Sequence, residues 1–254
     1  MAAVSGKEES MPKNIFAGIE KKTHQVDGRD FQLPILYHRL DSFLALYAAD
    51  YRAARALIPT VRLEPVKIWP GRTAVALMAY NYLDTDIGPY GEFAVALPCF
   101  CHDQGKRLFG FFVQRLPVTT QIALDYGVKL WGYPKFLSEM EFSNDSTSRS
   151  LKLSADGQLI LELSISKSGI GVPWTVPTKT FTIRNGEIIY TEITSVGVTR
   201  GMPQALARLN LGAHPMAQEL MSLRLGARPL FAAEVLDSQF ILPEGRSLGK
   251  AMGV

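Results

Sequence analysis

The chain has 254 residues, of which 47% are hydrophobic and 20% are charged, enough apolar material for one large domain or two small ones. Its 27 lysines and arginines and 24 acidic residues leave a net charge of +3 with histidine neutral. This composition excludes a disordered chain, and so small a surplus argues against a nucleic-acid-binding protein, which concentrates basic residues on one face. No run of 18 apolar residues occurs, so we expect no membrane span.

The N-terminal 25 residues are expected to form a polar tail, and residues 26–254 a single domain. The opening stretch, MAAVSGKEESMPKN, lacks the apolar run of a signal peptide. Cys99 and Cys101 are the only cysteines, and at this spacing on a strand they point the same way and make a poor disulfide pair. Both observations favour a cytoplasmic protein with reduced thiols.

The first predicted elements are a strand over Phe31–His38 and a helix from Asp41 to about Ile58. Asp41 is a favourable N-cap, and Pro59 would stop the helix. Between them, apolar side chains recur at three- and four-residue spacing, the pattern of a helix with one buried face. These side chains are Phe43, Leu44, Tyr47, Ala48, Tyr51 and Ala54.

Strand patterns dominate the rest of the chain. They lie at Thr73–Leu83, Glu92–His102, Leu108–Arg115, Leu137–Phe142, Ser150–Ser154, Gln158–Ser166, Phe181–Arg184, Glu187–Thr194 and Leu230–Leu242. Asp156-Gly157 and Asn185-Gly186 are favoured two-residue hairpin turns. One helix is expected over Pro215–Leu225, ended by Gly226.

Many antiparallel strands with few helices predict a β-rich α+β protein. We expect an antiparallel β-barrel-like core around an interior pocket, with a few flanking helices. The sequence contains no GxGxxG after a strand, no GxxxxGK[ST] and no GxSxG. It therefore argues against dinucleotide binding, P-loop nucleotide binding and serine-hydrolase chemistry. The segment Cys99–His102 has no second Cys/His cluster to complete a zinc site, so we expect neither a metal nor another cofactor.

The segment from Asp125 to Leu137, DYGVKLWGYPKFL, is the strongest candidate for chemistry. Lys135 follows Pro134, and large apolar residues flank it. These are Trp131, Tyr133, Phe136 and Leu137. Burial among such side chains disfavours the ammonium form, and only a neutral amine attacks a ketone. The alternative is a lysine whose stem packs on the aromatic residues while its head reaches solvent.

The stretch from Gly127 to Lys135, ending in Gly-Tyr-Pro-Lys, resembles the segment of the acetoacetate decarboxylase family that holds a Schiff-base lysine. Other stretches are similar to that family in the same order along the chain, from about residue 26 to 244. They are Arg29-Asp-Phe, Val75-Ala-Leu-Met-Ala-Tyr, Gly88-Pro-Tyr-Gly-Glu92, Glu192-Ile-Thr-Ser-Val-Gly-Val-Thr and Leu236-Asp-Ser-Gln-Phe-Ile-Leu-Pro243.

The resemblance implies three catalytic residues. Lys135 matches the Schiff-base lysine, Glu92 matches a pocket glutamate, and Arg29 matches the accompanying arginine. Two positions depart from the family pattern: Phe136 follows the nucleophile where a second lysine is typical, and the other pocket glutamate falls on Ala76. Desolvation is then the expected means of keeping the amine neutral.

Four further residues are expected to bind substrate: Phe136, Trp131, Tyr133 and Ala76. Read from the sequence alone, Glu92 and Arg29 can equally be solvated charges. Tyrosines such as Tyr80, Tyr82 and Tyr90 can donate to a substrate oxygen or simply pack on their strands.

The activity implied by the resemblance is that of a carboxy-lyase. It would decarboxylate an acetoacetate-like 3-oxo acid through a lysine Schiff base and release CO2 and a ketone, in a homo-oligomer that needs no cofactor. Two alternatives stay open. The same lysine can serve aldolase, dehydratase or hydrolase chemistry on a keto acid, or the protein can be a non-catalytic β-barrel that binds a small molecule.

Overall fold

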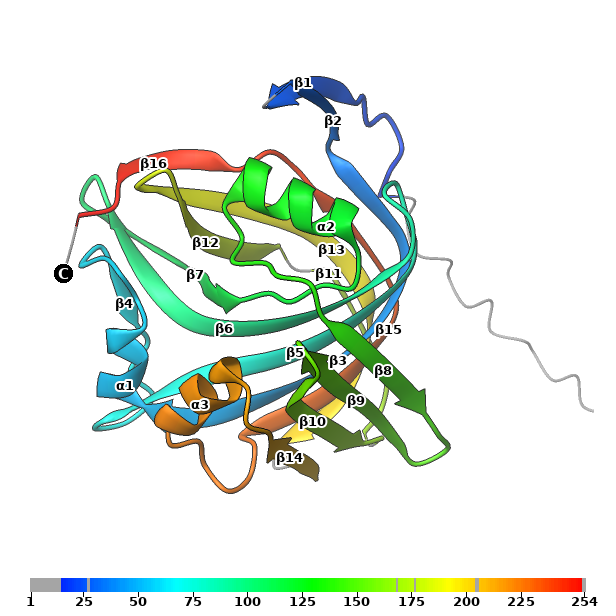
Figure 1. The fold of residues 1–254 in the computed structure, drawn as a ribbon, viewed down its shortest axis with the longest axis vertical. Coiled ribbons are helices and arrows are strands. Elements are labelled where there is room, and N and C mark those ends of the chain that lie inside the picture. Colours follow the sequence, from blue (N-terminus) through cyan, green and yellow to red (C-terminus); the bar gives the residue numbers. More distant parts are fainter. Residues whose placement is uncertain (1–14, 27, 168, 176, 204–205, 253–254) are drawn as a thin grey trace, which may run out of the picture.

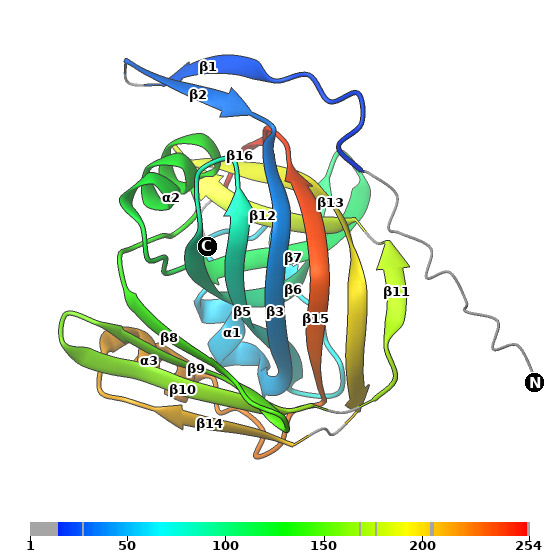
Figure 2. The same cartoon turned by 90° about the vertical axis from the view of Figure 1, so that its right-hand side faces the viewer.

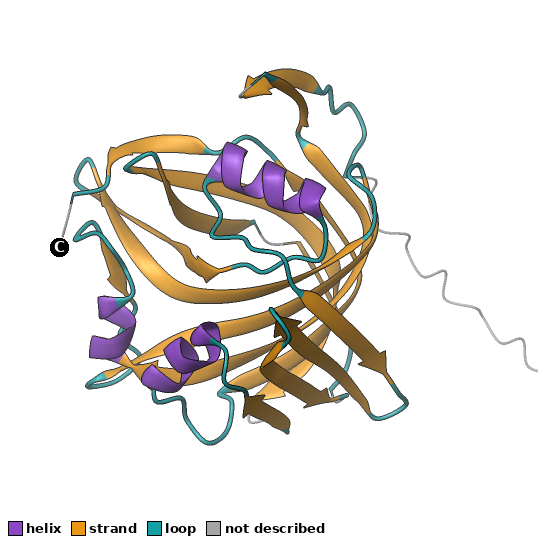
Figure 3. Cartoon of the chain, in the orientation of Figure 1, coloured by secondary structure: helices purple, strands orange, loops and turns teal. Residues whose placement is uncertain are grey.

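The computed structural model describes residues 15–26, 28–167, 169–175, 177–203 and 206–252. In these residues strands predominate and helices are few and short, as Figure 3 shows. This confirms the predicted β-rich α+β class. Among the described residues, none of the helices is long and apolar enough to cross a membrane.

The largest unit is a ten-stranded sheet within the described residues. Its strands are β3 (Ile35–Asp50), β4 (Leu63–Pro65), β5 (Arg72–Thr85), β6 (Tyr90–Asp103), β7 (Lys106–Arg115), β11 (Val172–Thr175), β12 (Thr178–Arg184), β13 (Glu187–Pro203), β15 (Phe231–Leu242) and β16 (Arg246–Lys250). The order is β11-β13-β12-β7-β6-β5-β3-β15, with β4 on β6 and β16 on β13. Because β13 also pairs with β15, the path closes into a ring of strands (Figure 1).

The remaining elements form a hairpin, a small sheet and short helices. The hairpin is β1 (Lys22–Val26) with β2 (Arg29–Leu33), and β1 begins inside the segment expected to be a tail. The small sheet has the order β14-β10-β9-β8, from β8 (Glu139–Asn144), β9 (Ser148–Ala155), β10 (Gln158–Ser166) and β14 (Ala207–Leu211). The helices are α1 (Tyr51–Ala56), α2 (Gln121–Tyr126), α3 (Pro215–Ser222) and the π-helical turn η1 (Gly127–Trp131). In Figure 2 the hairpin projects from one end of the ring and the small sheet lies at the other.

The helix predicted from Asp41 to Ile58 is wrong over most of its length. Residues 35–50 are strand β3, which is hydrogen-bonded to β5 on one side and β15 on the other. The helix that forms, α1, is short: Asp50 is its N-cap, accepting from the Ala53 amide at 2.9 Å, and it ends before Pro59. Every residue from Phe43 to Ala49 is apolar, so this part of the sequence fits a helical period and a strand buried on both faces equally well.

Most other predicted elements are confirmed, with most boundaries shifted by a few residues, but the strand predicted to end at Thr194 continues to Pro203. Both predicted two-residue turns have a left-handed backbone, with φ of 50° and 70° at Asp156-Gly157 and 51° and 75° at Asn185-Gly186. Positive φ at both positions is what a type I′ hairpin turn requires. The strands β1, β4, β11, β14 and β16 and the helical stretch α2–η1 were not predicted.

Two apolar clusters lie against the strands of the ring. The large cluster contains Leu77 and Phe93 of the ring, Leu151 and Leu163 of the small sheet and Leu220 of α3. The tyrosine cluster contains Tyr37, Tyr82, Tyr90, Trp131 and Tyr133, together with residues of β2 and α2. Successive strand residues alternate between the two clusters: on β6, Tyr90 and Ala94 belong to the tyrosine cluster, whereas Phe93 and Val95 belong to the large one.

A buried ion cluster joins the small sheet to the ring. Arg149 of β9 donates through Nε to Glu234 of β15 at 2.7 Å, and its Nη1 lies 3.4 Å from Asp41 of β3. Arg149 and Glu234 are both buried. Removing one charge from such a group leaves the other without a partner in a medium of low polarity, so the cluster fixes how the small sheet docks.

Candidate active site

The turn before Lys135 is shaped by two glycines. Gly127 is the first residue of the π-helical turn η1, and Gly132 caps the end of that turn with a left-handed φ of 66°. A Cβ atom added to Gly127 would lie closer than 3.0 Å to both Cδ and Cε of Lys135. The lysine side chain therefore runs back across Gly127, and only glycine leaves it room.

Side-chain and backbone hydrogen bonds fix this segment to the ring. Trp131 is buried and its Nε1 donates to the Pro243 carbonyl at 2.9 Å, at the end of β15. The Tyr133 hydroxyl lies 3.1 Å from the Thr180 hydroxyl on β12, and the Thr182 hydroxyl donates to the Trp131 carbonyl. These contacts hold the residues just before Lys135 at two separate strands.

A short extended stretch places Lys135 next to β6. The amides of Leu116 and Val118 donate to the carbonyls of Pro134 and Phe136, at 3.1 and 2.9 Å. On its other side, Val118 forms an antiparallel bridge with Glu92. Residues 116–118 thus lie between the lysine segment and β6, and bring together two side chains that stand 43 positions apart.

Lys135 and Glu92 form a buried ion pair. The Nζ atom lies 2.6 Å from Oε2, and the two side chains are 6% and 8% exposed. The second carboxylate oxygen, Oε1, accepts from the Tyr82 hydroxyl at 2.9 Å. Glu92 therefore has a charged donor on one oxygen and a neutral donor on the other, which is how a buried carboxylate is kept satisfied.

Aromatic rings surround the amine. Nζ lies 5.6 Å from the centroid of Tyr90 and 5.8 Å from that of Tyr133. The Tyr90 hydroxyl meets that of Tyr37 at 2.9 Å, and the Tyr80 and Tyr82 rings are stacked 5.6 Å apart. The surroundings of Lys135 are thus tyrosine rings and a carboxylate, and not the purely apolar wall expected from the sequence.

The tyrosine hydroxyls remain protonated in this environment. Burial, and then the charge of Glu92, raises the pKa of Tyr82 well above its ordinary value. Burial also raises the pKa of Tyr133 to about 12, although its hydrogen bond with Thr180 acts in the opposite direction. Each hydroxyl is therefore a neutral hydrogen-bond donor at physiological pH.

The predicted substrate-binding residues divide into two groups. Trp131 and Tyr133 belong to the tyrosine cluster beside Lys135. Phe136 packs against the large cluster instead, and its ring stacks on His214 at 5.9 Å and 15°. Leu137, expected to enclose the lysine, is 47% exposed. Ala76 is buried in β5, on the same face as Tyr80 and Tyr82.

Of the other two predicted catalytic residues, only Glu92 contacts Lys135. Arg29, at the start of β2, is 62% exposed and its Nη1 lies 2.6 Å from Asp125 of α2. Asp125 stands two positions before Gly127, so this ion pair links the N-terminal hairpin to the helix that leads into the lysine segment. The structure does not bring the Arg29 guanidinium to the Lys135–Glu92 pair.

Sequence reasoning missed Gly127, Tyr37 and Thr180. The only signal for the tyrosines is the period-two placement of Tyr80 and Tyr82 on one strand and of Tyr90 and Glu92 on the next.

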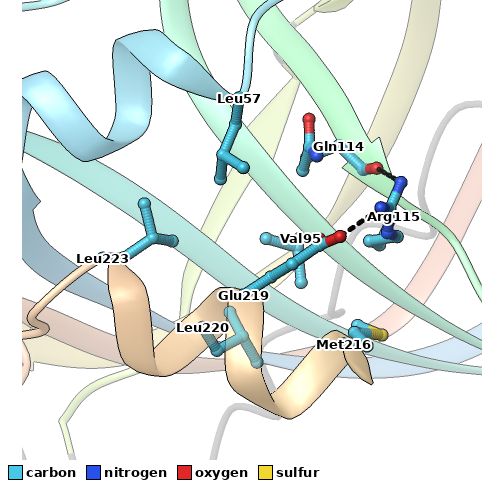
Figure 4. Close-up of a pocket in the computed structure, with 8 residues that line it drawn as sticks. All are labelled: Leu57, Val95, Gln114, Arg115, Met216, Glu219, Leu220 and Leu223. Atoms are coloured by element: carbon cyan, nitrogen blue, oxygen red, sulfur yellow. Dashed lines mark hydrogen bonds and ion pairs between the residues drawn. The ribbon is translucent and has the colours of Figure 1, made fainter. Parts of the chain in front are cut away.

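A recess between α1, α3 and the ring, shown in Figure 4, lies in the large cluster and leaves no space that a water molecule can enter. The described residues contain no group of three or more His, Cys, Asp or Glu side chains that can hold a metal.

A buried amine beside a carboxylate and several hydroxyls is suited to covalent chemistry on a carbonyl compound. Glu92 can accept the proton that Lys135 must lose before it attacks, because the two atoms are already in hydrogen-bond contact. The phenolic hydroxyls can donate to oxygen atoms of a bound ligand.

This chain is similar to known proteins in sequence and in fold. The sequence profile of the acetoacetate decarboxylase (ADC) family matches residues 30–235. A solved acetoacetate decarboxylase structure has 21% identity over 84% of this chain and 88% of its own, with a TM-score of 0.67. The acetoacetate decarboxylase of Legionella pneumophila has 15% identity over 98% of this chain and 99% of its own, with a TM-score of 0.69.

A third solved structure is the enduracididine biosynthesis enzyme MppR complexed with pyruvate. It has 15% identity over 85% of this chain and 91% of its own, with a TM-score of 0.61. At these identities the structural likeness shows the fold alone. A comparison with proteins of curated function finds no match.

Proposed function

Because this chain belongs to the acetoacetate decarboxylase family, we propose that it decarboxylates a 3-oxo carboxylic acid through a Schiff base on Lys135. The observation that carries the proposal is the buried contact of 2.6 Å between the Lys135 amine and the Glu92 carboxylate. A lysine that served only to pack would not need a buried counter-charge, which costs free energy to desolvate.

In the proposed reaction Glu92 takes a proton from Lys135, and the neutral amine attacks the ketone carbon of the substrate. Loss of water gives an iminium. The bond between the carboxylate carbon and C2 then breaks, its electron pair forms the C2–C3 double bond of an enamine, and CO2 leaves. Protonation at C2 and addition of water release the ketone and restore the amine.

The residues around Lys135 would assist the reaction in different ways. Glu92 holds the proton and returns it during formation and hydrolysis of the iminium, and Tyr82 keeps that carboxylate oriented through its hydrogen bond of 2.9 Å. Trp131 and Tyr133 enclose the amine. We propose a positioning role for Arg29, through its ion pair with Asp125. Protomers of the protein would associate as a cytoplasmic homo-oligomer and would need no cofactor.

A second candidate function uses the same iminium without loss of CO2. A structural neighbour, MppR, is complexed with pyruvate, a 2-oxo acid. A 2-oxo acid bound as an iminium at Lys135 can form an enamine at C3 by losing a proton, and that enamine can attack an aldehyde in an aldol reaction. Phe136 and Ala76, which depart from the family pattern, are the sequence features that keep this candidate open.

The deciding experiment measures the products and the adduct together. The protein is incubated with acetoacetate, CO2 and acetone are quantified, and borohydride is added to a parallel sample before peptide mass spectrometry. We expect evolved CO2 and a reduced adduct on Lys135. An adduct with pyruvate and an aldehyde, with no CO2 from any 3-oxo acid, would favour the aldol candidate.

The control variants separate chemistry from charge. Lys135→Arg keeps a positive charge beside Glu92 but cannot form an iminium, so it should abolish both turnover and adduct. Lys106→Arg changes an exposed lysine at the start of β7 and should leave both intact. Full activity in Lys135→Arg would contradict the proposal. A ligand that stabilises the protein, with neither adduct nor turnover, would identify a binding protein instead.

A further inference from the structure

The face of the ring that carries Glu92 changes from polar to apolar along the strands. Glu92, Ala94 and Ala96 occupy alternate positions of β6, so their side chains lie on one face. The residues directly opposite them on β5 are Tyr80, Met78 and Ala76. The rung of Glu92 and Tyr80 is polar, and the next two rungs consist of Met78 with Ala94 and of Ala76 with Ala96.

The apolar character of these two rungs extends over neighbouring strands. Leu44 of β3 is opposite Met78, and Ala233 of β15 is opposite Leu44. The following rung is Phe231, Leu46, Ala76, Ala96 and Val113, running from β15 to β7. At about 7 Å between rungs on the same face, this surface extends about 14 Å from Glu92.

The small side chains on these rungs are not as tightly packed as the opposite face of the same strands. Ala76, Ala94 and Ala96 are 4%, 6% and 4% exposed, whereas Leu77 and Leu97 are 0% exposed. Met78, Leu44 and Leu46 are half-buried. On the opposite face Val75 and Phe93 are also 0% exposed, so the exposed surface of this part of β5 and β6 lies mainly on the face that carries Glu92.

Tyr80 links the polar rung to the first apolar rung. Its hydroxyl donates to the Met78 sulfur at 3.4 Å, and its ring stacks on that of Tyr82 with centroids 5.6 Å apart. The side chains of Tyr80 and Met78 are both only half-buried. Half-buried surface is therefore continuous from the rung of Glu92 to the first apolar rung.

From this arrangement we propose that the carbon chain of the substrate lies along Met78, Ala94, Ala76 and Ala96, with its ketone at Lys135. The preferred substrate is then a 3-oxo acid whose unbranched apolar chain is longer than the methyl group of acetoacetate. Ala76 is central to this assignment because a glutamate there would place a charge on the second apolar rung. Alanine removes that charge and leaves the space that a glutamate side chain would fill. The inference rests on the proposed function, since it concerns the substrate of the same lysine.

The test compares acetoacetate, 3-oxohexanoate and 3-oxooctanoate as substrates of the wild-type protein and of Ala94→Leu. Wild type should favour 3-oxohexanoate over acetoacetate by about 100-fold in kcat/KM, because 3-oxohexanoate has two more methylene groups and each contributes about tenfold in an apolar site. Ala94→Leu fills the first apolar rung and should reduce that preference by about 10- to 100-fold. Ala96→Val, a smaller change one rung further, should affect 3-oxooctanoate more than 3-oxohexanoate.

Ala56→Leu is the matched control, since it makes the same change at an exposed position at the end of α1 and should leave the preference unaltered. Thermal melting of every variant identifies any loss of folding. Turnover of acetoacetate equal to or faster than that of the longer acids, with Ala94→Leu affecting all three alike, would overturn this inference and leave the decarboxylase proposal standing. Absence of CO2 and of a Lys135 adduct with all three acids would overturn both.

Discussion

Replacing Gly127 with alanine tests the geometry that places Lys135 beside Glu92. The backbone at Gly127 has φ of −62° and ψ of −45°, an ordinary right-handed helical conformation that alanine adopts without strain. The new methyl group, however, would lie closer than 3.0 Å to Cδ and Cε of Lys135 and 3.1 Å from its Nζ. The lysine side chain must move, and Nζ then leaves Glu92.

The size of the effect follows from two opposing contributions. Alanine in place of glycine in a helical turn adds up to about 1 kcal/mol of stability. Separating a buried ion pair costs about 3–5 kcal/mol when the remaining charge finds no partner. We expect a net loss of about 2–4 kcal/mol in the free energy of unfolding, which leaves a typical domain folded. A displacement of about 1 Å at a reacting group costs on the order of 100-fold in rate, so kcat/KM should fall by at least that factor.

The assay combines CO2 release, borohydride trapping on Lys135 and thermal unfolding followed by circular dichroism. Val128→Ala is the matched control, because Val128 follows Gly127 in the same turn and is 41% exposed. It should keep wild-type activity. If Gly127→Ala turned over substrate as fast as the wild type, the contact between Gly127 and the lysine stem would not set the position of the amine, and the reasoning would fail.

Three further variants test the charges and hydrogen bonds. Glu92→Gln should lower the free energy of unfolding by about 3–5 kcal/mol, because it leaves Lys135 buried without its counter-charge; an unaltered free energy in urea unfolding would show that this ion pair does not contribute to stability. Tyr82→Phe removes a hydrogen bond to a carboxylate and should lower kcat/KM by about 10- to 100-fold. Burial and Glu92 raise the pKa of Tyr82, so its hydroxyl stays protonated, and the ratio of wild-type to Tyr82→Phe kcat/KM should be constant from neutral to mildly alkaline pH. A ratio that varies with pH would show that this hydroxyl ionises in that range. Glu234→Ala leaves Arg149 buried with only the longer contact to Asp41. It should lower the free energy of unfolding, measured with denaturant, by about 3 kcal/mol without changing KM. An unaltered free energy of unfolding would show that this ion cluster does not hold the small sheet.

Local sequence patterns were sufficient to predict the elements whose conformation depends on residues close together in the chain. Asp156-Gly157 and Asn185-Gly186 form hairpin turns because these residues accept the left-handed backbone that such turns need. The strands that flank both turns were also predicted, and β9, which leads into Asp156-Gly157, alternates between a covered and an open face. The stretch at residues 35–50 was not, because its apolar residues satisfy both periods and only pairing with β5 and β15 selects the strand.

The sequence predicted Lys135 of the candidate site but not the residues that surround it. The sequence marks Lys135 through its aromatic neighbours, but it pointed to desolvation by Phe136 as the means of keeping the amine neutral. In the structure Phe136 packs against the large cluster, and the amine meets Glu92. Which way a side chain faces in an irregular segment depends on what covers each side, and that is tertiary information.

The sequence by itself determined the strand-rich class, the turns, the choice of Lys135 as the candidate residue, and the likeness of the chain to a family. Tertiary structure alone decided that Glu92 reaches Lys135, that tyrosines from separate strands gather around them, and that Arg29 pairs with Asp125. The physical reason is the distance along the chain between the residues that interact. Turn conformation and strand period arise from neighbours in the chain, whereas the partner of a buried charge comes from whichever strand the closed ring of hydrogen bonds brings within a few ångströms.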